Sequence, residues 1–403
     1  MRRGRATSAD ESLPSSAAGS GPSAEALARL RLARTEGVGP QTWRRALARF
    51  GSAEAALAAL PRYPAPRGGG SPSRPPPEAE ALREWEAVAR LGGRFLFLGD
   101  PGYPRLLALT EDAPPVLAVL GDPAVLSATQ VAIVGARNAS TAGRRIAEEL
   151  AEALARAGVV VTSGLARGID AAAHEGALRG GRTVAVVAGG LDQPYPPENA
   201  ALQARIAEAG GAVVSEAPLG TAPLARHFPR RNRIVAGLVL GVVVVEAAQR
   251  SGSLITARLA LEAGRELFAV PGSPLDPRCR GSNDLIRQGA HLTETIEDIL
   301  PNLPEAPRDG PLFHPGALPR NRPEETGAVL PAPAPAADDI EQVLDLIGHS
   351  PVPVDEVTRR CHLSASALQA ILLELELQGR IECLPGARVA RIGPARNEPT
   401  GPA

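Results

Sequence analysis

The 403-residue sequence contains no lysine, so all 43 of its basic side chains are arginine. The planar guanidinium of arginine binds phosphate through two parallel hydrogen bonds. The 44 acidic residues nearly cancel this charge and leave a formal net charge of −1. Because the total is close to zero, it favours no polyanionic partner by itself. We therefore attribute the arginine bias first to genome composition.

Cysteines and aromatic residues are also scarce. Three cysteines without paired short spacing cannot form a disulfide framework or a four-ligand zinc site, which favours a reducing compartment, the cytosol. His174 has no second histidine at metal spacing, so we expect a packed or capping histidine and no metal site. With aromatics at only 3%, Val, Leu, Ile and Ala must fill the core, which suits a parallel sheet.

The sequence offers no membrane segment. Residues 1–23 combine arginines with Ser, Ala, Gly and Pro and lack an apolar core, so we expect a disordered tail and not a signal peptide or anchor. The apolar run 234–248 is shorter than a membrane span and contains Gly237 and Gly241, so we interpret it as a buried strand.

Composition shifts divide the chain into domains. A helical pattern interrupted at Gly37–Pro40 predicts a helical hairpin, and a further helix is expected over 78–91. The predicted units are a tail (1–23), a helical domain (24–94), an α/β domain (95–300), a Pro-rich linker (301–337), a compact module (338–393) and a second tail (394–403).

Short apolar runs that end in a small residue recur through the α/β segment. They occupy 130–134, 159–162, 184–188, 213–214, 238–245 and 267–270, and alanine-rich helical patterns such as 146–157 fill the gaps. Strand alternating with helix predicts a Rossmann-like, doubly wound parallel sheet. Ligands of such sheets bind beyond the carboxyl ends of the strands, so the residues after each run are the first candidates for a site.

Glycine-rich turns follow the first three runs. They contain Gly135, Arg137, Ser163, Gly164, Arg167 and Gly190. The first turn is not a complete G-x-G-x-x-G, because Arg137 replaces the second glycine, and no acidic residue ends the second strand to bind a ribose. We therefore expect no dinucleotide cofactor. A glycine turn can simply close a βα unit, but three such turns at neighbouring strand ends favour a phosphate site.

Residues 226–233 hold four arginines in a segment that we interpret as a loop before a buried strand. Arg230 and Arg233 lie there beside Phe228 and Asn232, which favours a polyphosphate or nucleic-acid backbone as partner. Because aromatic residues are few, backbone contacts should carry most of the affinity, and sequence preference should be weak. The turn with Ser251 and Ser253 either caps a helix or contacts a phosphate.

These residues resemble the DprA/Smf family of DNA-processing proteins of natural transformation. The resemblance covers nearly all of the α/β segment, and its blocks occur in order. They are 131–137, 163–170 with 173–174, 190–192 with 195–196 and 199, 215–216, 228–234, 245–247, 250–257, 270–272, 281–283, 285–286 and 289–290.

The resemblance implies a dimeric protein without catalytic activity that binds single-stranded DNA regardless of sequence, protects incoming DNA and loads the RecA recombinase onto it. The predicted DNA-binding residues are Gly135, Arg137, Ser163, Gly164, Arg167, Gly190, Asn199, Phe228, Arg230, Asn232, Arg233, Ser251 and Ser253. Some relatives have a lysine where this chain has Pro197, so either Arg230 or Arg231 compensates or phosphate affinity is lower.

Residues 338–391 resemble the winged-helix module that some members of the family carry, and Gly37–Pro40 resembles a helix-hairpin-helix turn. Helices are expected from Asp338, over 354–360 and over 364–378, followed by a wing at 381–389. The third helix contains Glu374 and Glu376 and no arginine, so phosphates should repel it. We predict a protein-contact or self-association surface there.

An enzyme is the alternative. Nucleotide phosphoribohydrolases share the superfold, and Arg250 to Glu262 resembles a degenerate form of their P-G-G-x-G-T-x-x-E segment. That chemistry needs a carboxylate aimed at a ribose carbon, whereas here Glu262 follows a Ser-Gly-Ser turn, with no second acid evident. A nicotinamide enzyme is disfavoured by the missing ribose acid.

Overall fold

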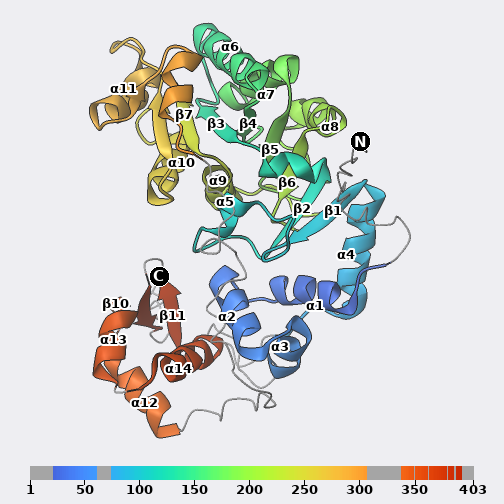
Figure 1. The fold of residues 1–403 in the computed structure, drawn as a ribbon, viewed down its shortest axis with the longest axis vertical. Coiled ribbons are helices and arrows are strands. Elements are labelled where there is room, and N and C mark those ends of the chain that lie inside the picture. The colour runs from blue at the N-terminus through green and yellow to red at the C-terminus, as the bar shows by residue number, and fades with distance from the viewer. Residues whose placement is uncertain are drawn as a thin grey trace, which may run out of the picture.

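The computed structural model describes residues 21–60, 74–305, 337–348, 350–361, 363–378, 380–384 and 387–392. The predicted tails and linker fall largely outside the described residues, at 1–20, 306–336 and 393–403. Figure 1 shows three units in chain order, a helical unit in blue, a large sheet with its helices, and a small unit in orange and red.

The helical unit contains the predicted hairpin. Its helices are α1 (Ala24–Ala33), α2 (Pro40–Phe50), α3 (Ala53–Ala59) and α4 (Glu78–Arg90). Gly37 has a φ of 81°, in the left-handed region where glycine is favoured, and Pro40 supplies the first residue of α2. Trp43 of α2 and Leu32 of α1 are buried between these helices.

Within the described residues the central sheet has nine strands. They are β1 (Gly93–Phe97), β2 (Val116–Gly121), β3 (Gln130–Gly135), β4 (Val160–Ser163), β5 (Thr183–Val186), β6 (Ala212–Ser215), β7 (Gly241–Val245), β8 (Glu266–Ala269) and β9 (His291–Leu292). Their order is β1-β2-β6-β5-β4-β3-β7-β8-β9. The strands from β3 onward are parallel, as predicted, whereas β1 and β2 form an antiparallel edge that the sequence analysis missed.

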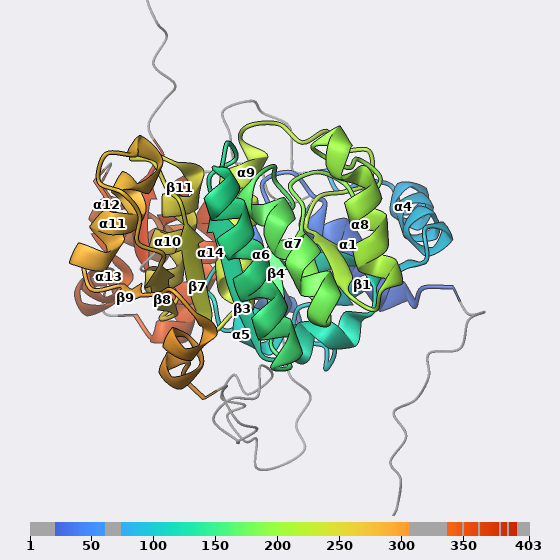
Figure 2. The same ribbon diagram turned by 90° about the horizontal axis from the view of Figure 1, so that it is seen from above.

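Helices cover both faces of this sheet (Figure 2). Val131 and Ile133 of β3 pack with α6 (Thr141–Arg156) and α7 (Ile169–Gly180), whereas the alternate residues Ala132 and Val134 pack with α9 (His227–Leu238) and α10 (Gly252–Glu262). The remaining helices are α5 (Arg105–Ala108), α8 (Ala200–Glu208) and α11 (Arg280–Arg287). The chain leaves β3 toward β4 and leaves β7 toward β8 in the opposite direction, so the switch point of the sheet lies between β3 and β7.

The interpretation of residues 226–233 as a loop is wrong. Arg226 is the N-cap residue of α9 and the other three arginines lie in its first turns; the helix runs to Leu238, and the strand begins only at Gly241. Pro229 fits the first turn of a helix, where its missing N–H has no intrahelical partner. Because the buried end of α9 and the buried strand are both apolar, the sequence shows one continuous apolar run.

The winged-helix unit has its expected elements. They are α12 (Ala337–Leu346), β10 (Val352–Pro353), α13 (Val354–Arg360), α14 (Ala365–Leu377), β11 (Ile381–Leu384) and β12 (Arg388–Arg391). The third helix, α14, packs against α2 of the helical unit. Leu373 is buried there beside Trp43, and Glu376 forms an ion pair with Arg45 at 2.9 Å. Part of this acidic helix therefore packs within the chain, and its role as a surface for another protein stays a prediction.

No helix in the described parts of the chain has the length and apolar character that crossing a membrane requires. The apolar run 234–248, which raised the question of a membrane segment, is divided between the end of α9, β7 and the turn after β7.

Candidate nucleic-acid interface

An exposed cation and an aromatic ring meet where the loops after β3 and β5 approach the first turn of α9. The guanidinium carbon of Arg137 lies 4.9 Å from the centre of the Phe228 ring, and that of Arg231 lies 6.0 Å from it. The Tyr195 ring approaches Phe228 edge-on, with centroids 5.8 Å apart. Arg137 and Tyr195 are exposed and Phe228 is half-buried. The cation and the two rings therefore lie together at the carboxyl ends of the parallel strands, an edge that we call the rim.

Beneath this cluster Arg231 is buried, with 6% of its surface exposed. Its Nη1 donates to the carbonyl oxygen of Val186 at 3.2 Å, and its Nε finds no partner among the described residues. A Cβ at Gly164 would coincide with this guanidinium, so only glycine fits at that position. Gly164 therefore serves the site by making room for a buried cation.

Asp170, at the start of α7, supplies the nearest buried carboxylate. It accepts a hydrogen bond from the Ala166 N–H at 3.3 Å. Burial raises the pKa of Asp170 and lowers the pKa of Arg231, while the attraction between the two charges opposes both shifts. The repulsion between Arg231 and Arg137 lowers the pKa of Arg231 further. The guanidiniums of Arg137 and Arg231 therefore interact at the rim, and Asp170 compensates the charge of the buried Arg231 only in part.

Three other predicted residues form the scaffold of the loops. Ser163 is buried and donates to the carbonyl oxygen of Ile133 at 2.6 Å. Asn199 donates to the carbonyl oxygen of Leu165 at 2.9 Å and so holds a backbone whose φ is 57°. A Cβ at Gly135 would collide with the backbone carbonyl of Val245. These groups position the rim, and the Ser163 hydroxyl and the Asn199 amide nitrogen already donate hydrogen bonds within the protein.

Two of the predicted arginines are ion-paired within the chain. Arg167 is paired with Glu198 on the exposed side of its loop. Arg233 is largely buried and binds both carboxylate oxygens of Glu216 at 2.6 Å, with Asp112 on its other side. The guanidinium of Arg233 is therefore already bound within the chain, beside the end of β6 and the segment before β2. Arg230 is exposed and Arg231 is buried in the same helix.

The first turn of α10 completes the rim. The hydroxyls of Ser251 and Ser253 are 2.6 Å apart, and Asn232 donates to the Gly252 carbonyl at 3.4 Å. Asn232 therefore joins α9 to α10. Gly190 lies in the loop after β5, where a Cβ would meet the Pro218 carbonyl at 2.7 Å.

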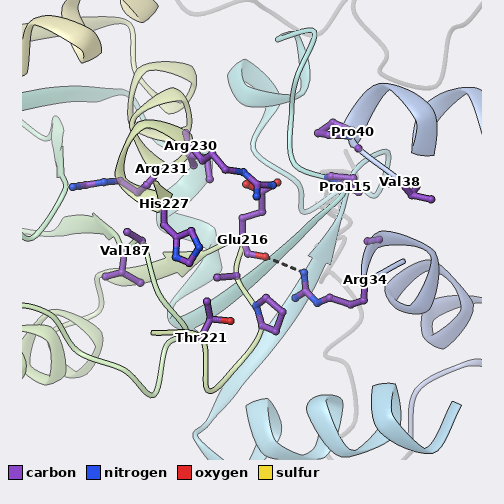
Figure 3. Close-up of a pocket in the computed structure, with 16 residues that line it drawn as sticks. Arg34, Val38, Pro40, Pro115, Val187, Glu216, Thr221, His227, Arg230 and Arg231 are labelled. Atoms are coloured by element: carbon purple, nitrogen blue, oxygen red, sulfur yellow. Dashed lines mark hydrogen bonds between the residues drawn. The ribbon is translucent and has the colours of Figure 1, made fainter. Parts of the chain in front are cut away.

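A pocket of about 290 Å³ lies between the helical unit and α9 (Figure 3). Arg34 of the helical unit donates to the Glu216 carbonyl oxygen at 2.9 Å across it, while Arg231 extends away from it. His227 and Arg230 also line it. Sequence reasoning missed this pocket, because Arg34 and Glu216 are far apart in the chain and no local motif connects them.

One other expectation concerns His174, which lies beneath the rim. His174 is buried, and its Nδ1 lies 2.8 Å from the Thr183 hydroxyl, which confirms a packed histidine. The Thr183 hydroxyl donates to the Val161 carbonyl, so the His174 Nδ1 carries the proton that it shares with Thr183. Burial, assisted by the charge of Arg231, lowers the pKa of His174 to about 3.

Comparison with known proteins assigns each unit. Residues 94–304 match the family model described as DNA recombination-mediator protein A, residues 23–87 match a DprA-like N-terminal HHH domain, and residues 328–387 match a DprA winged helix domain.

Curated relatives extend this match. Protein Smf of Escherichia coli is 44% identical over 295 residues, which cover 71% of this chain and 74% of that protein. DNA processing protein DprA of Bacillus subtilis is 45% identical over 205 residues, or 50% of this chain and 69% of that protein.

A solved structure has the same fold. The X-ray structure of DNA processing protein A from Streptococcus pneumoniae superposes with a TM-score of 0.59 at 32% identity, covering 71% of this chain and all 100% of that one. The order of the matched blocks, the architecture of the three units and the extent of identity agree. The chain therefore belongs to the DprA/Smf family of DNA-processing proteins.

Proposed function

We propose that this chain binds single-stranded DNA without sequence preference at the rim of the central sheet, protects incoming DNA and loads RecA onto it during transformation. The observation that carries the proposal is the exposed guanidinium of Arg137 stacked on Phe228. Cations that contact phosphates, next to rings that stack on bases, are the two components of non-specific single-strand binding.

We assign two exposed arginines to phosphates, Arg137 at this rim and Arg230 on the pocket side of α9. Phe228 and Tyr195 are the rings available for stacking. Guanidinium–phosphate contacts and ring stacking do not distinguish one base from another, so affinity should depend strongly on salt and weakly on sequence. Ser163, Gly164, Asn199 and Arg231 position these groups from below.

The recombination part of the proposal is supported by the match to the DNA recombination-mediator model. We include RecA as the protein partner, a homodimer as the active form, and a cytosolic location. The three cysteines are all free thiols, which is consistent with a reducing compartment. RecA assembly on a single strand should be faster with the full chain than with its Arg137→Ala variant.

We propose a binding protein and not an enzyme. The phosphoribohydrolase alternative would place Glu262 at the reacting sugar. Glu262 is exposed and ends α10, an 11-residue helix whose first turn lies at the rim. Its length of about 16 Å separates Glu262 from the carboxyl ends of the strands. No observation therefore favours hydrolysis.

The test is a fluorescence titration of the full chain with oligodeoxythymidine, a mixed-sequence strand and a duplex, between about 50 mM and about 300 mM salt. Arg137→Ala should bind both single strands roughly tenfold more weakly and lower the salt slope by about one unit. The matched control is Arg145→Ala, which removes an exposed arginine of α6 paired with Glu149. Equal affinities of the two variants at every salt concentration would contradict the proposed site.

A further inference from the structure

The switch point of the sheet has a second side, where the first turn of α6 follows β3. In doubly wound sheets this helix N-terminus, with its free N–H groups, is the ordinary place for a nucleotide phosphate. In this chain a carboxylate of the protein occupies the place. It belongs to Glu246, the residue after β7, which is buried with 8% of its surface exposed.

Glu246 accepts hydrogen bonds from Ser140, the N-cap residue of α6, whose hydroxyl also caps the Gly143 N–H. The Ser140 N–H donates to Oε2 of Glu246 at 2.9 Å, and the Ser140 hydroxyl donates to Oε1. A Cβ on Gly143 would lie 2.5 Å from the carboxylate carbon and 2.7 and 2.9 Å from its oxygens. The carboxylate therefore rests directly against the backbone of the first turn of α6, where only glycine leaves it room.

Backbone geometry also directs Glu246 to this position. Its φ is 51°, in the left-handed region that residues other than glycine, asparagine and aspartate rarely adopt. Such strain persists only where the surrounding structure holds it, and it concentrates at binding sites. Here the conformation turns the chain sharply after β7 and is accompanied by the hydrogen bonds to Ser140.

The space beside Glu246 is lined by carboxylates. A pocket of about 180 Å³ opens there, and two acidic residues line it, Glu246 and Asp276, of which Asp276 is paired with Arg278 at 2.7 Å. The other side of the same switch point carries Arg137 and Arg231 around Phe228. Carboxylates therefore line the α6 side of the junction of β3 and β7, whereas guanidiniums surround Phe228 on the α9 side.

We propose that Glu246 is a specificity-determining residue that closes the phosphate position of the fold to free nucleotides. A nucleotide that entered would have to displace the hydrogen-bonded carboxylate of Glu246. Phosphates are then accepted only on the α9 side, where a polynucleotide can span several contacts. The claim that phosphates bind on the α9 side rests on the proposed function. The claim that Glu246 excludes nucleotides rests only on the contacts of Glu246.

The test measures binding of ADP and of inorganic phosphate to the full chain by calorimetry and by thermal melting. Glu246→Gly removes the carboxylate and fits the φ of 51°, and Glu246→Asn removes the charge with a residue that tolerates that conformation. The matched control, Glu262→Gln, removes one negative charge at the exposed far end of α10. Both Glu246 variants should bind ADP at least tenfold more tightly than the wild type and the control. The wild type and the control should show no saturation by ADP below about 10 mM.

Saturable ADP binding by the wild type, or cooperatively melting Glu246 variants without a gain, would overturn the inference. Oligodeoxythymidine is titrated in parallel and should bind Glu246→Gly within about twofold of the wild type, because the strand lies on the other side. If the wild type fails to bind the oligonucleotide, the proposed function fails, and the ADP comparison still decides the role of Glu246.

Discussion

The rim of the central sheet and the third helix of the winged-helix unit both lie in modules that resemble DNA binders. The rim presents an exposed arginine, whereas the helix carries glutamates, one of which is paired within the chain. At the rim, Arg137 is exposed over Phe228. On α14, Glu376 is turned to Arg45 of the helical unit and Leu373 is buried beside Trp43. The comparison teaches that a DNA-binding topology sets where a helix lies, while its charges decide whether phosphate or protein is the partner.

The two regions also differ in how their charges are stabilised. Arg231 under the rim is buried with an unpartnered Nε, whereas the side chains of Arg45 and Glu376 keep 24% and 15% exposure and bind each other. A buried, incompletely paired charge is costly to disturb, and a partly exposed ion pair contributes little. The predictions follow this difference.

The largest effect is expected for Arg231→Ala. The change leaves Asp170 buried without its nearest cation and opens a cavity against Gly164, so the free energy of unfolding should fall by about 3 kcal/mol. Urea denaturation measures the change. Arg230→Ala, at the exposed neighbouring position, is the control and should stay within about 0.5 kcal/mol of the wild type. Equal losses in both variants would show that burial of the cation is not what matters.

A second effect concerns His174, which lies beneath the rim. Its pKa of about 3 is below its ordinary value of 6.5, so the folded state resists protonation, and stability present above pH 6.5 is lost as the pH falls toward 3. From pH 7 to pH 5 this loss should be about 2 kcal/mol. In His174→Gln, which does not titrate, denaturation midpoints should change less over the same range. Parallel pH profiles for both proteins would contradict the assignment.

Removing the aromatic part of the rim should have a smaller effect. Phe228→Ala deletes a stacking ring and no phosphate contact, so single-strand affinity should fall roughly tenfold with an unchanged salt slope. Phe228→Trp, which keeps a ring, should restore most of the affinity. A lower slope in Phe228→Ala would instead show that the ring acts by positioning Arg137.

The smallest effects belong to the winged-helix side. Glu376→Gln breaks a partly exposed ion pair and should cost less than about 1 kcal/mol in unfolding experiments. Deleting residues 338–403 should leave single-strand affinity within about twofold, because an acidic helix contributes no phosphate contacts. A large loss of affinity on deletion would erase the contrast between the two regions.

Much of this arrangement was predictable from the sequence. Small residues after apolar runs marked the strand ends, and the expected strands correspond to β3 to β8. The pattern of residues 364–378 predicted a helix, which corresponds to α14. These predictions succeeded because they depend on periodicity and charge within a short stretch of chain. For the same reason the end of α9, apolar on all sides, was mistaken for a strand.

Several features of the site depended on the tertiary structure. Arg230 and Arg233 lie in the same cluster of arginines, and the sequence does not indicate that Glu216 binds Arg233 and not Arg230. The pocket between Arg34 and α9 and the antiparallel strands β1 and β2 went unnoticed. Glu246 lies in the matched block 245–247, and nothing in the sequence indicates that its carboxylate binds the N-cap residue of α6.

By itself the sequence determined the kinds of elements, their order along the chain and the chemistry available at each strand end. Only the tertiary structure decided which arginines stay exposed, which are neutralised within the chain, and which helix N-terminus is already occupied by a carboxylate. The physical reason is that periodicity and composition act between neighbours in the chain. Electrostatic pairing acts between side chains that meet in space, here across the 106 residues that separate Ser140 from Glu246.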